Sequence, residues 1–396
     1  MRALLATCLL LTGLALQGQL AYEGRVLDAS TGRPIPFVNI GILSRGIGTV
    51  SDADGNFLLE FYPREVGPGD VLRLSSLGYQ PKEIPLEKLD ARVAAFTFRL
   101  QPDAISLQEV VVSDKKLLEA EQTHGYPDLI GKGIGYWKDS VALGGELASL
   151  IRLRKGLYRL NSLNFHILEN PADSLLLRIN IYSPDTGAGN PGENLNKSGK
   201  NILYTLRGGT IFSVIDLAPY DIWARNDVIV SLELLGLYGA ETIGLALPAG
   251  GYPGGKSWRR YASQGSWEPI DGSVVGFSLQ MTLFTDNPRR LPGKRALRRQ
   301  QKKEREISGK VFREGPQARD YPASAPIIGA TVRNYTQNEA VETDKWGRYH
   351  IKVAPGDILG VSYPDHYQIV LEIEIPKDIN FKLHRIGDLP MVWKDQ

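Results

Sequence analysis

Histidines are the residues of this sequence best suited to bind a metal or to transfer a proton. One of them forms a suggestive pair, because the spacing of His166 and Glu169 is one that supplies two zinc ligands in zinc peptidases. The run 157–168 alternates as a strand does, and an offset of three places the two side chains on opposite faces. A third ligand would have to come from a connecting segment or from the C-terminal part, where the other histidines lie: His124, His350, His366 and His384. We therefore expect no catalytic zinc.

Other catalytic chemistry has little support in the sequence. The only cysteine, Cys8, lies in an apolar N-terminal run, so a processed chain has no thiol nucleophile, disulfide or cysteine metal site. No Gly-x-Ser-x-Gly elbow, phosphate loop or dinucleotide fingerprint occurs. Paired carboxylates of a glycosidase meet in space, which one sequence does not show. We expect a non-catalytic protein without a cofactor, and a secreted hydrolase acting on peptide or glycan is the alternative.

Aromatic residues gather in the latter half of the chain and are candidate ligand contacts. Flat aromatic faces stack on sugar rings or on side chains of a partner. A loop rich in glycine and proline, 248–255, could display them. Core packing is the main interpretation, with a carbohydrate face and a protein contact as alternatives. These residues are Trp223, Tyr252, Trp258, Tyr261 and Trp267.

Two turn motifs occur near both ends of the chain. In Asp-x-x-Gly and Pro-Gly-Asp turns the Asp side chain bonds turn amides, and Gly takes the left-handed conformation. A calcium site needs six or more oxygens, and Trp346 stands where the first copy has Asp54, so these residues are expected to be structural. They are Asp52, Gly55, Gly69 and Asp70 in the first copy, and Asp344, Gly347, Gly356 and Asp357 in the second.

These turns belong to an internal repeat, in which five landmarks recur in the same order in 24–100 and 307–383. Four to seven short strands between the landmarks are enough for a small two-sheet sandwich. We predict that both segments have one topology.

The first copy, followed by Leu107-Gln108-Glu109-Val110-Val111-Val112, resembles the carboxypeptidase-regulatory-like domain of exported Bacteroidota proteins, including TonB-dependent receptors. The second copy resembles it more loosely. The resemblance implies a transthyretin-like, seven-stranded sandwich without catalytic residues. About 280 residues remain after the Glu-Val-Val-Val stretch, and they contain a second soluble domain in place of membrane strands, so a transporter is not expected.

Between the two copies, residues 125–285 show short alternating runs broken by Gly, Pro, Asn and Asp, which predict a jelly-roll-like sandwich. The fold class is therefore all-β, with two small transthyretin-like or Ig-like sandwiches flanking this domain. Residues 114–122 favour a short connecting helix. The expected divisions are a signal peptide 1–21, a first sandwich 22–100, a linker 101–124, the middle domain 125–285, a basic linker 286–306 and a second sandwich 307–396.

A segment dense in positive charge follows the middle domain. Nine basic residues face two acidic ones over 289–306, which gives nine minus two, or +7. A solvated linker with helix-forming residues in 295–306 is the main interpretation, and contact with anionic envelope lipid or an acidic partner is the alternative. Nucleic acid is not an expected partner, since the whole chain carries only +2.

The N-terminus resembles a secretory signal, with Arg2, a short apolar run and small residues near Gly18, where we expect cleavage. No second long apolar run follows, so no transmembrane segment is expected. We predict an exported protein that is periplasmic, outer-membrane-associated or extracellular. Its expected role is that of a structural or binding accessory protein of the envelope or exterior, with an envelope protein or a glycan as partner.

Overall fold

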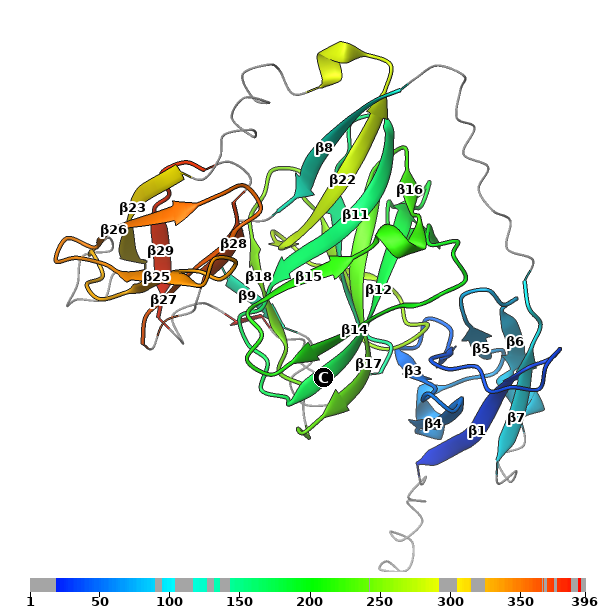
Figure 1. The fold of residues 1–396 in the computed structure, drawn as a ribbon. Coiled ribbons are helices and arrows are strands. Elements are labelled where there is room, and N and C mark those ends of the chain that lie inside the picture. The colour runs from blue at the N-terminus through cyan, green and yellow to red at the C-terminus, as the bar shows by residue number, and fades with distance from the viewer. Residues whose placement is uncertain are drawn as a thin grey trace, which may run out of the picture. The chain divides into compact units, whose positions relative to one another are not determined.

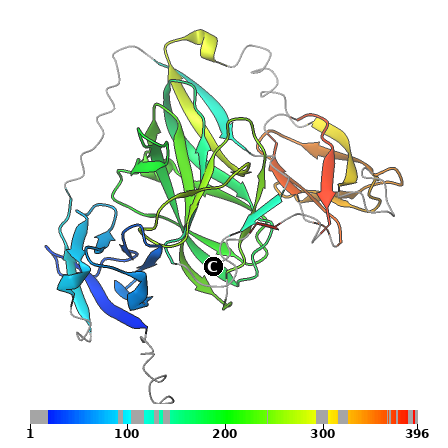
Figure 2. The same ribbon diagram turned by 180° about the vertical axis from the view of Figure 1, so that it is seen from behind.

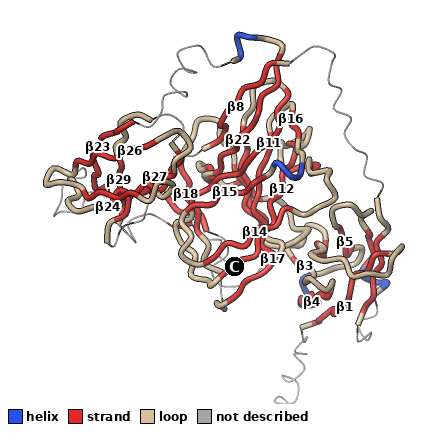
Figure 3. The backbone as a smooth tube through the Cα atoms, in the orientation of Figure 1, coloured by secondary structure: helices blue, strands red, loops and turns tan. Residues whose placement is uncertain are grey.

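The computed structural model describes residues 19–89, 95–103, 117–126, 132–135, 143–241, 243–291, 305–314, 325–364, 366, 369–373, 376–385 and 391–392. Within these ranges the chain forms strands and four short 3-10 turns and has no α-helix (Figure 3), which confirms the all-β class. No helix in the described ranges is long and apolar enough to cross a membrane. The expected signal peptide lies outside the described residues, except for 19–21.

Two compact units make up the described chain. Unit 1 contains the first sandwich together with residues 143–144 and 260–266. Unit 2 contains the rest of the middle region and the second sandwich. The division into three separate domains therefore remains a prediction.

Seven strands build the first sandwich, drawn in blue and cyan in Figure 1. One sheet has the order β4-β1-β7 and the other has the order β3-β2-β5-β6. β1 begins at Leu20, two residues before the expected domain boundary, and pairs antiparallel with β4 and parallel with β7. The strands are β1 (Leu20–Asp28), β2 (Asn39–Ile42), β3 (Ile47–Val50), β4 (Asn56–Phe61), β5 (Val71–Ser75), β6 (Lys82–Pro85) and β7 (Phe96–Leu100), with 3-10 turns at Pro63–Glu65 and Leu86–Lys88.

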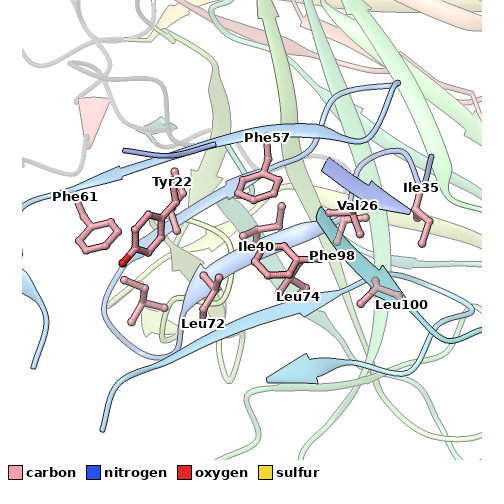
Figure 4. Close-up of a cluster of buried hydrophobic side chains, with 13 residues drawn as sticks. Tyr22, Val26, Ile35, Ile40, Phe57, Phe61, Leu72, Leu74, Phe98 and Leu100 are labelled. Carbon is pink, nitrogen blue, oxygen red and sulfur yellow. The ribbon is translucent and has the colours of Figure 1, made fainter. Parts of the chain in front are cut away.

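Strict alternation along β4 explains the core of this sandwich. Phe57, Leu59 and Phe61 are buried, whereas the residues between them are exposed. They meet apolar residues of both sheets, including Tyr22 and Leu72 (Figure 4). Complete burial of each such side chain contributes about 1.5–3 kcal/mol.

The middle region contains fifteen strands in the described residues. The largest sheet runs β13-β12-β17-β10-β19-β20 with β14 on β12, and a second runs β15-β11-β22-β8 with β16 on β11. The strands are β8 (Leu118–Gly125), β9 (Lys132–Gly135), β10 (Glu146–Ile151), β11 (Leu157–His166), β12 (Ser174–Pro184), β13 (Pro191–Asn194), β14 (Ile202–Arg207), β15 (Phe212–Asp216), β16 (Trp223–Ala224), β17 (Val228–Tyr238), β18 (Ala246–Gly250), β19 (Ser257–Arg260), β20 (Glu268–Pro269), β21 (Val274–Val275) and β22 (Phe277–Thr285), with 3-10 turns at Ala218–Tyr220 and Pro288–Arg290. The jelly-roll description of this region remains a prediction.

The expected connecting helix at 114–122 is wrong where the chain is described. Residues 118–125 form β8, which pairs antiparallel with β22 over its whole length. Helix propensity favours a helix by only tenths of a kcal/mol per residue, and pairing with β22 overrides it. The linker expected at 101–124 therefore ends before Leu118, and His124 lies in a strand.

The second sandwich repeats the first, strand for strand, and appears in orange and red in Figures 1 and 2. Its sheets run β26-β23-β29 and β25-β24-β27-β28, which is the order of the first sandwich, and β23 is again antiparallel to one neighbour and parallel to the other. The single topology predicted from the repeat is confirmed. The strands are β23 (Arg305–Glu314), β24 (Thr331–Asn334), β25 (Glu339–Glu342), β26 (Arg348–Val353), β27 (Ile358–Ser362), β28 (Ile369–Glu372) and β29 (Phe381–His384).

Both ends of this sandwich differ from expectation. β23 begins at Arg305, so the last two residues of the expected basic linker are strand, while residues 292–304 lie outside the described chain. At the other end, β30 (Met391–Val392) leaves the sandwich and pairs in parallel with β9 in the sheet β21-β18-β9-β30.

Candidate functional site

The Asp-x-x-Gly turns have the geometry expected of structural turns. In the first sandwich Asp52 Oδ1 accepts hydrogen bonds from the amides of Asp54 at 2.9 Å and Asn56 at 2.8 Å. Gly55 has φ +76°, a left-handed conformation that glycine adopts without strain. In the second sandwich Asp344 Oδ1 accepts from the amides of Trp346 and Arg348, both at 2.8 Å, and Gly347 has φ +72°.

The Pro-Gly-Asp turns share one hydrogen bond and differ in the rest. Asp70 accepts from the amide three residues before it at 2.8 Å and forms an ion pair with Arg45 at 3.0 Å. Arg45 lowers the pKa of Asp70. Asp357 makes the same amide contact at 2.8 Å, but it is buried and accepts from the side-chain amides of Asn334 and Gln337, both at 2.7 Å. The two glycines, Gly69 and Gly356, have φ +85° and +88°.

The five candidate aromatic residues do not form one surface. Trp223 lies on the five-stranded sheet, where its indole N–H donates to Asp221 at 2.9 Å. Tyr252 is 53% exposed and packs against Tyr126, and Tyr261 belongs to unit 1. Two residues do come together, because Trp258 and Trp267 lie in one cluster with Tyr182, Ala148, Leu150 and Ile229.

A polar network lies on the same face of the seven-stranded sheet as this cluster. Arg178, Asn180 and Tyr182 alternate along β12 and so point to one side. Glu233 on β17 accepts two hydrogen bonds from Arg178, at 2.8 and 2.7 Å, and one from Asn180 at 2.8 Å. Glu146, cross-strand from Glu233, accepts from Tyr182 at 3.2 Å and from Ser231.

Apart from Tyr182, which is half-buried, the network is buried, with Glu146 and Glu233 both 0% exposed. Burial alone would lower the pKa of Arg178, but contact with Glu233 more than offsets it, so the pKa is raised and the ion pair is kept. Removing one partner of such a pair costs about 3–5 kcal/mol, because it leaves a charge buried alone. The arrangement can therefore fix the register of β12, β17 and β10.

This network was not predicted from the sequence, although the sequence carries a signal of it. Arg178 lies between Leu177 and Ile179 in a mostly apolar run, and Glu233 lies between Leu232 and Leu234 in another. A charged residue on a strand that is otherwise apolar on both faces predicts a buried partner.

The pair His166 and Glu169 does not form a metal cluster in the described structure. The His166 ring packs against Phe212 with ring centroids 4.7 Å apart, and burial lowers the pKa of His166 to about 4. Glu169 follows β11 and bridges to Ala246 through its backbone. Among described residues no group of three His, Cys, Asp or Glu side chains could hold a metal ion. The absence of a catalytic zinc remains a prediction.

Unit 1 contains a binding arrangement that the sequence did not reveal. Gly41 on β2 and Gly48 on β3 are cross-strand neighbours, and a Cβ on either would clash with the carbonyl oxygen of Ser263. The same segment is held by two hydrogen bonds, from Ser44 N to Gln264 O at 3.2 Å and from Gln264 Nε2 to Ser75 Oγ at 2.8 Å. We call Gly41 and Gly48 the glycine strip, because together they admit the backbone of segment 260–266.

Comparison with known proteins agrees with the architecture of the first sandwich. Residues 22–112 match the family described as CarboxypepD_reg-like domain. Over 121 residues the chain is 32% identical to the TonB-dependent receptor SusC of Bacteroides thetaiotaomicron. The aligned region covers 29% of this chain and 11% of the receptor. The resemblance is confirmed for this part of the chain, which spans only about a tenth of that relative.

Solved structures that align with much of this chain include pilins and an adhesin. BcpA, the major pilin subunit of Bacillus cereus, aligns with 93% of this chain and 100% of its own at 7% identity and a TM-score of 0.15. An adhesin from Mobiluncus mulieris aligns with 67% of this chain and 98% of its own at 9% identity and a TM-score of 0.16. Alignments at these TM-scores carry no conclusion about this chain.

Proposed function

We propose that the protein is a non-catalytic structural or binding accessory protein of the cell envelope or cell exterior. The observation that carries this proposal is the glycine strip, on which the first sandwich seats the turn of segment 260–266 against its backbone. The first sandwich thus offers a surface that can seat a turn of peptide chain. Three observations support the location. The N-terminus resembles a secretory signal, residues 22–112 match the CarboxypepD_reg-like domain family, and part of the chain is similar to a TonB-dependent receptor.

The test is a screen of the chain from residue 19 onward against peptide and polysaccharide panels, with binding and turnover measured together. We expect saturable binding to at least one panel and no turnover. Retaining residue 19 matters because β1 begins at Leu20.

One observation favours the alternative, a hydrolase, because Glu146 and Glu233 are cross-strand carboxylates on one face of the sheet. Glu146→Gln and Glu233→Gln keep the shape of each side chain and remove its charge. Turnover that Glu146→Gln abolishes while the thermal midpoint stays within a few degrees would contradict our proposal, whereas Glu233→Gln also removes the charge that Arg178 contacts and is expected to lower that midpoint.

A further inference from the structure

The second sandwich carries an exposed aromatic side chain between two cations. Trp346, in the turn before β26, is 52% exposed. Lys345 Nζ lies 4.1 Å and Arg348 Cζ lies 5.2 Å from the centroid of its ring. Ile328 is 57% exposed and lies at the same end of the sandwich as Trp346. Its chain neighbours Pro326 and Ile327 lie so close to Gly347, the residue after Trp346, that a Cβ on Gly347 would meet them. We call Ile328, Lys345, Trp346 and Arg348 the basic tip.

The turn itself does not require these residues, as the first sandwich demonstrates. Ser51 of the first sandwich and Thr343 of the second occupy equivalent positions, because their hydroxyls make equivalent hydrogen bonds. The Ser51 hydroxyl accepts from the amide of Val38 at 2.8 Å, and the Thr343 hydroxyl accepts from the amide of Ala330 at 2.9 Å. Each hydroxyl also donates to the backbone carbonyl of an isoleucine. With this register, the positions of the basic tip are occupied in the first sandwich by Pro36, Ala53, Asp54 and Asn56. Both turns nevertheless make the same Asp hydrogen bonds. The basic tip is therefore a surface feature added to a shared frame.

Positive charge continues beyond the tip. Lys352 is exposed on the same face of β26 as Arg348, and Lys310 is the cross-strand neighbour of Arg348. The nearest acid, Asp344, is engaged with the turn amides, and the hydrogen bond from the amide of Arg348 lowers its pKa most. Acidic Glu306 lies on the neighbouring strand, and Asp378 accepts from the amide of Ser308.

The chemistry of the tip fits a lipid surface better than a sugar. Lys345 and Arg348 already lie over the indole ring, where a sugar would stack, and Ile328 offers no hydrogen bond. Tryptophan prefers the boundary between headgroups and acyl chains, and each nearby Lys or Arg strengthens binding to an anionic surface about fivefold. A convex turn with two apolar side chains and flanking cations matches such a boundary.

We propose that the basic tip of the second sandwich docks on an anionic lipid membrane surface. Trp346 and Ile328 enter the interface, while Lys345 and Arg348 contact headgroup phosphates. This surface is separate from the glycine strip, so the docking does not depend on the proposed function of the first sandwich.

The test is cosedimentation of the chain from residue 19 with vesicles of phosphatidylcholine, with and without phosphatidylglycerol. The variant Lys345→Ala/Trp346→Asp/Arg348→Asn gives three of the four tip positions the residues of the first sandwich. We expect binding that requires phosphatidylglycerol and falls at least tenfold in the variant. The basic segment 289–306 is present in both proteins, so the difference reports the tip alone.

Two controls keep the test decisive. Arg64→Ala removes a cation that lies 4.8 Å from the ring centroid of Tyr62 in the first sandwich, and it should leave binding unchanged. Grafting Ala53→Lys/Asp54→Trp/Asn56→Arg into the tip variant should restore binding. Equal binding by the tip variant, or capture of dextran sulfate by the tip without capture of vesicles, would overturn the proposal.

Discussion

The first and second sandwiches have one strand order and the same turn hydrogen bonds, yet their sheet surfaces differ. Gly41 and Gly48 of the first occupy the register positions that Arg333 and Ala340 occupy in the second. The glycines admit a chain segment, whereas Arg333 and Ala340 present side chains there. Buried alternation and turns thus fix the topology of the repeat, and the residues outside the core decide what each copy can bind.

Polar contacts near the strand ends differ in a similar way. In the first sandwich Tyr79 donates to Asp28 at 3.0 Å, next to the bridge from Tyr79 to Pro102. In the second, Arg313 donates to His366 at 3.2 Å, next to the bridge from His366 to Arg385. The first sandwich therefore has an acidic side chain, Asp28, in this contact, whereas the second has a basic one, Arg313.

The largest effect is expected from Gly48→Ala, which gives the first sandwich the residue that the second has at that position. Every atom that the new Cβ would meet within 3.0 Å belongs to Ser263, so segment 260–266 must move away. Overpacking of this size costs about 1–3 kcal/mol, which corresponds to opening that is about fivefold to more than a hundredfold more frequent. Limited trypsin digestion after Arg260 should accelerate by that factor.

Two variants show whether this effect is specific to the glycine strip. Gly67→Ala should change nothing, because its nearest contact would be a side-chain atom of Arg45 at 3.8 Å. Ala340→Gly in the second sandwich should cost only about 0.5–1 kcal/mol of strand stability. Unchanged cleavage after Arg260 in Gly48→Ala would show that the strip does not hold the segment.

A smaller effect is expected from Asp357→Ala. The substitution leaves the amide donors of Asn334 and Gln337 without their buried acceptor, at a cost of about 2 kcal/mol in the free energy of unfolding. The matched change Asp70→Ala should cost less, since Arg45 can turn to solvent. Urea denaturation followed by hydrogen exchange in each sandwich measures both, and a larger loss for Asp70→Ala would reverse the comparison.

The smallest expected effect is a difference in acid sensitivity. Hydrogen bonds, chiefly from the amide of Thr31, lower the pKa of Asp28 in the folded chain. Because the pKa of Asp28 is lower in the folded chain than its value of 3.8 in the unfolded chain, the ionised carboxylate stabilises the fold at pH values above 3.8. This stabilisation is lost as the pH falls through the pKa of the folded chain. Asp28→Asn should therefore weaken the first sandwich near pH 6 and make little difference near pH 2.

Pepsin digestion at several acidic pH values can follow this titration, with cleavage inside 22–100 compared with cleavage inside 307–383. The second sandwich serves as the internal control because Arg313, which has no carboxyl group, stands at the position of Asp28. The cleavage ratio is the rate of cleavage inside 22–100 divided by the rate inside 307–383. If Asp28→Asn changes this ratio by the same factor at every pH, titration of Asp28 is not the cause of the change.

Local patterns made the topology of the repeat predictable, because Asp52, Gly55, Asp344 and Gly347 specify turns through bonds within five residues. The glycine strip was not predictable, since Ser263 meets Gly48 only in the folded chain. Propensity misled at 118–125, where β22 supplies the partner of a strand. The aromatic residues were predicted as a group because they lie close in sequence, but Trp223 and Trp258 belong to different sheets.

Seating of segment 260–266 on the glycine strip also affects the order in which the chain can fold. The hydrogen bond between Gln264 and Ser75 joins residues 189 positions apart. A ribosome releases Gly41 and Gly48 long before it has made Ser263, and contacts of such long range form slowly. During that interval the glycine strip has no chain segment seated on it. We therefore expect the first sandwich to form its own core before segment 260–266 is seated on it.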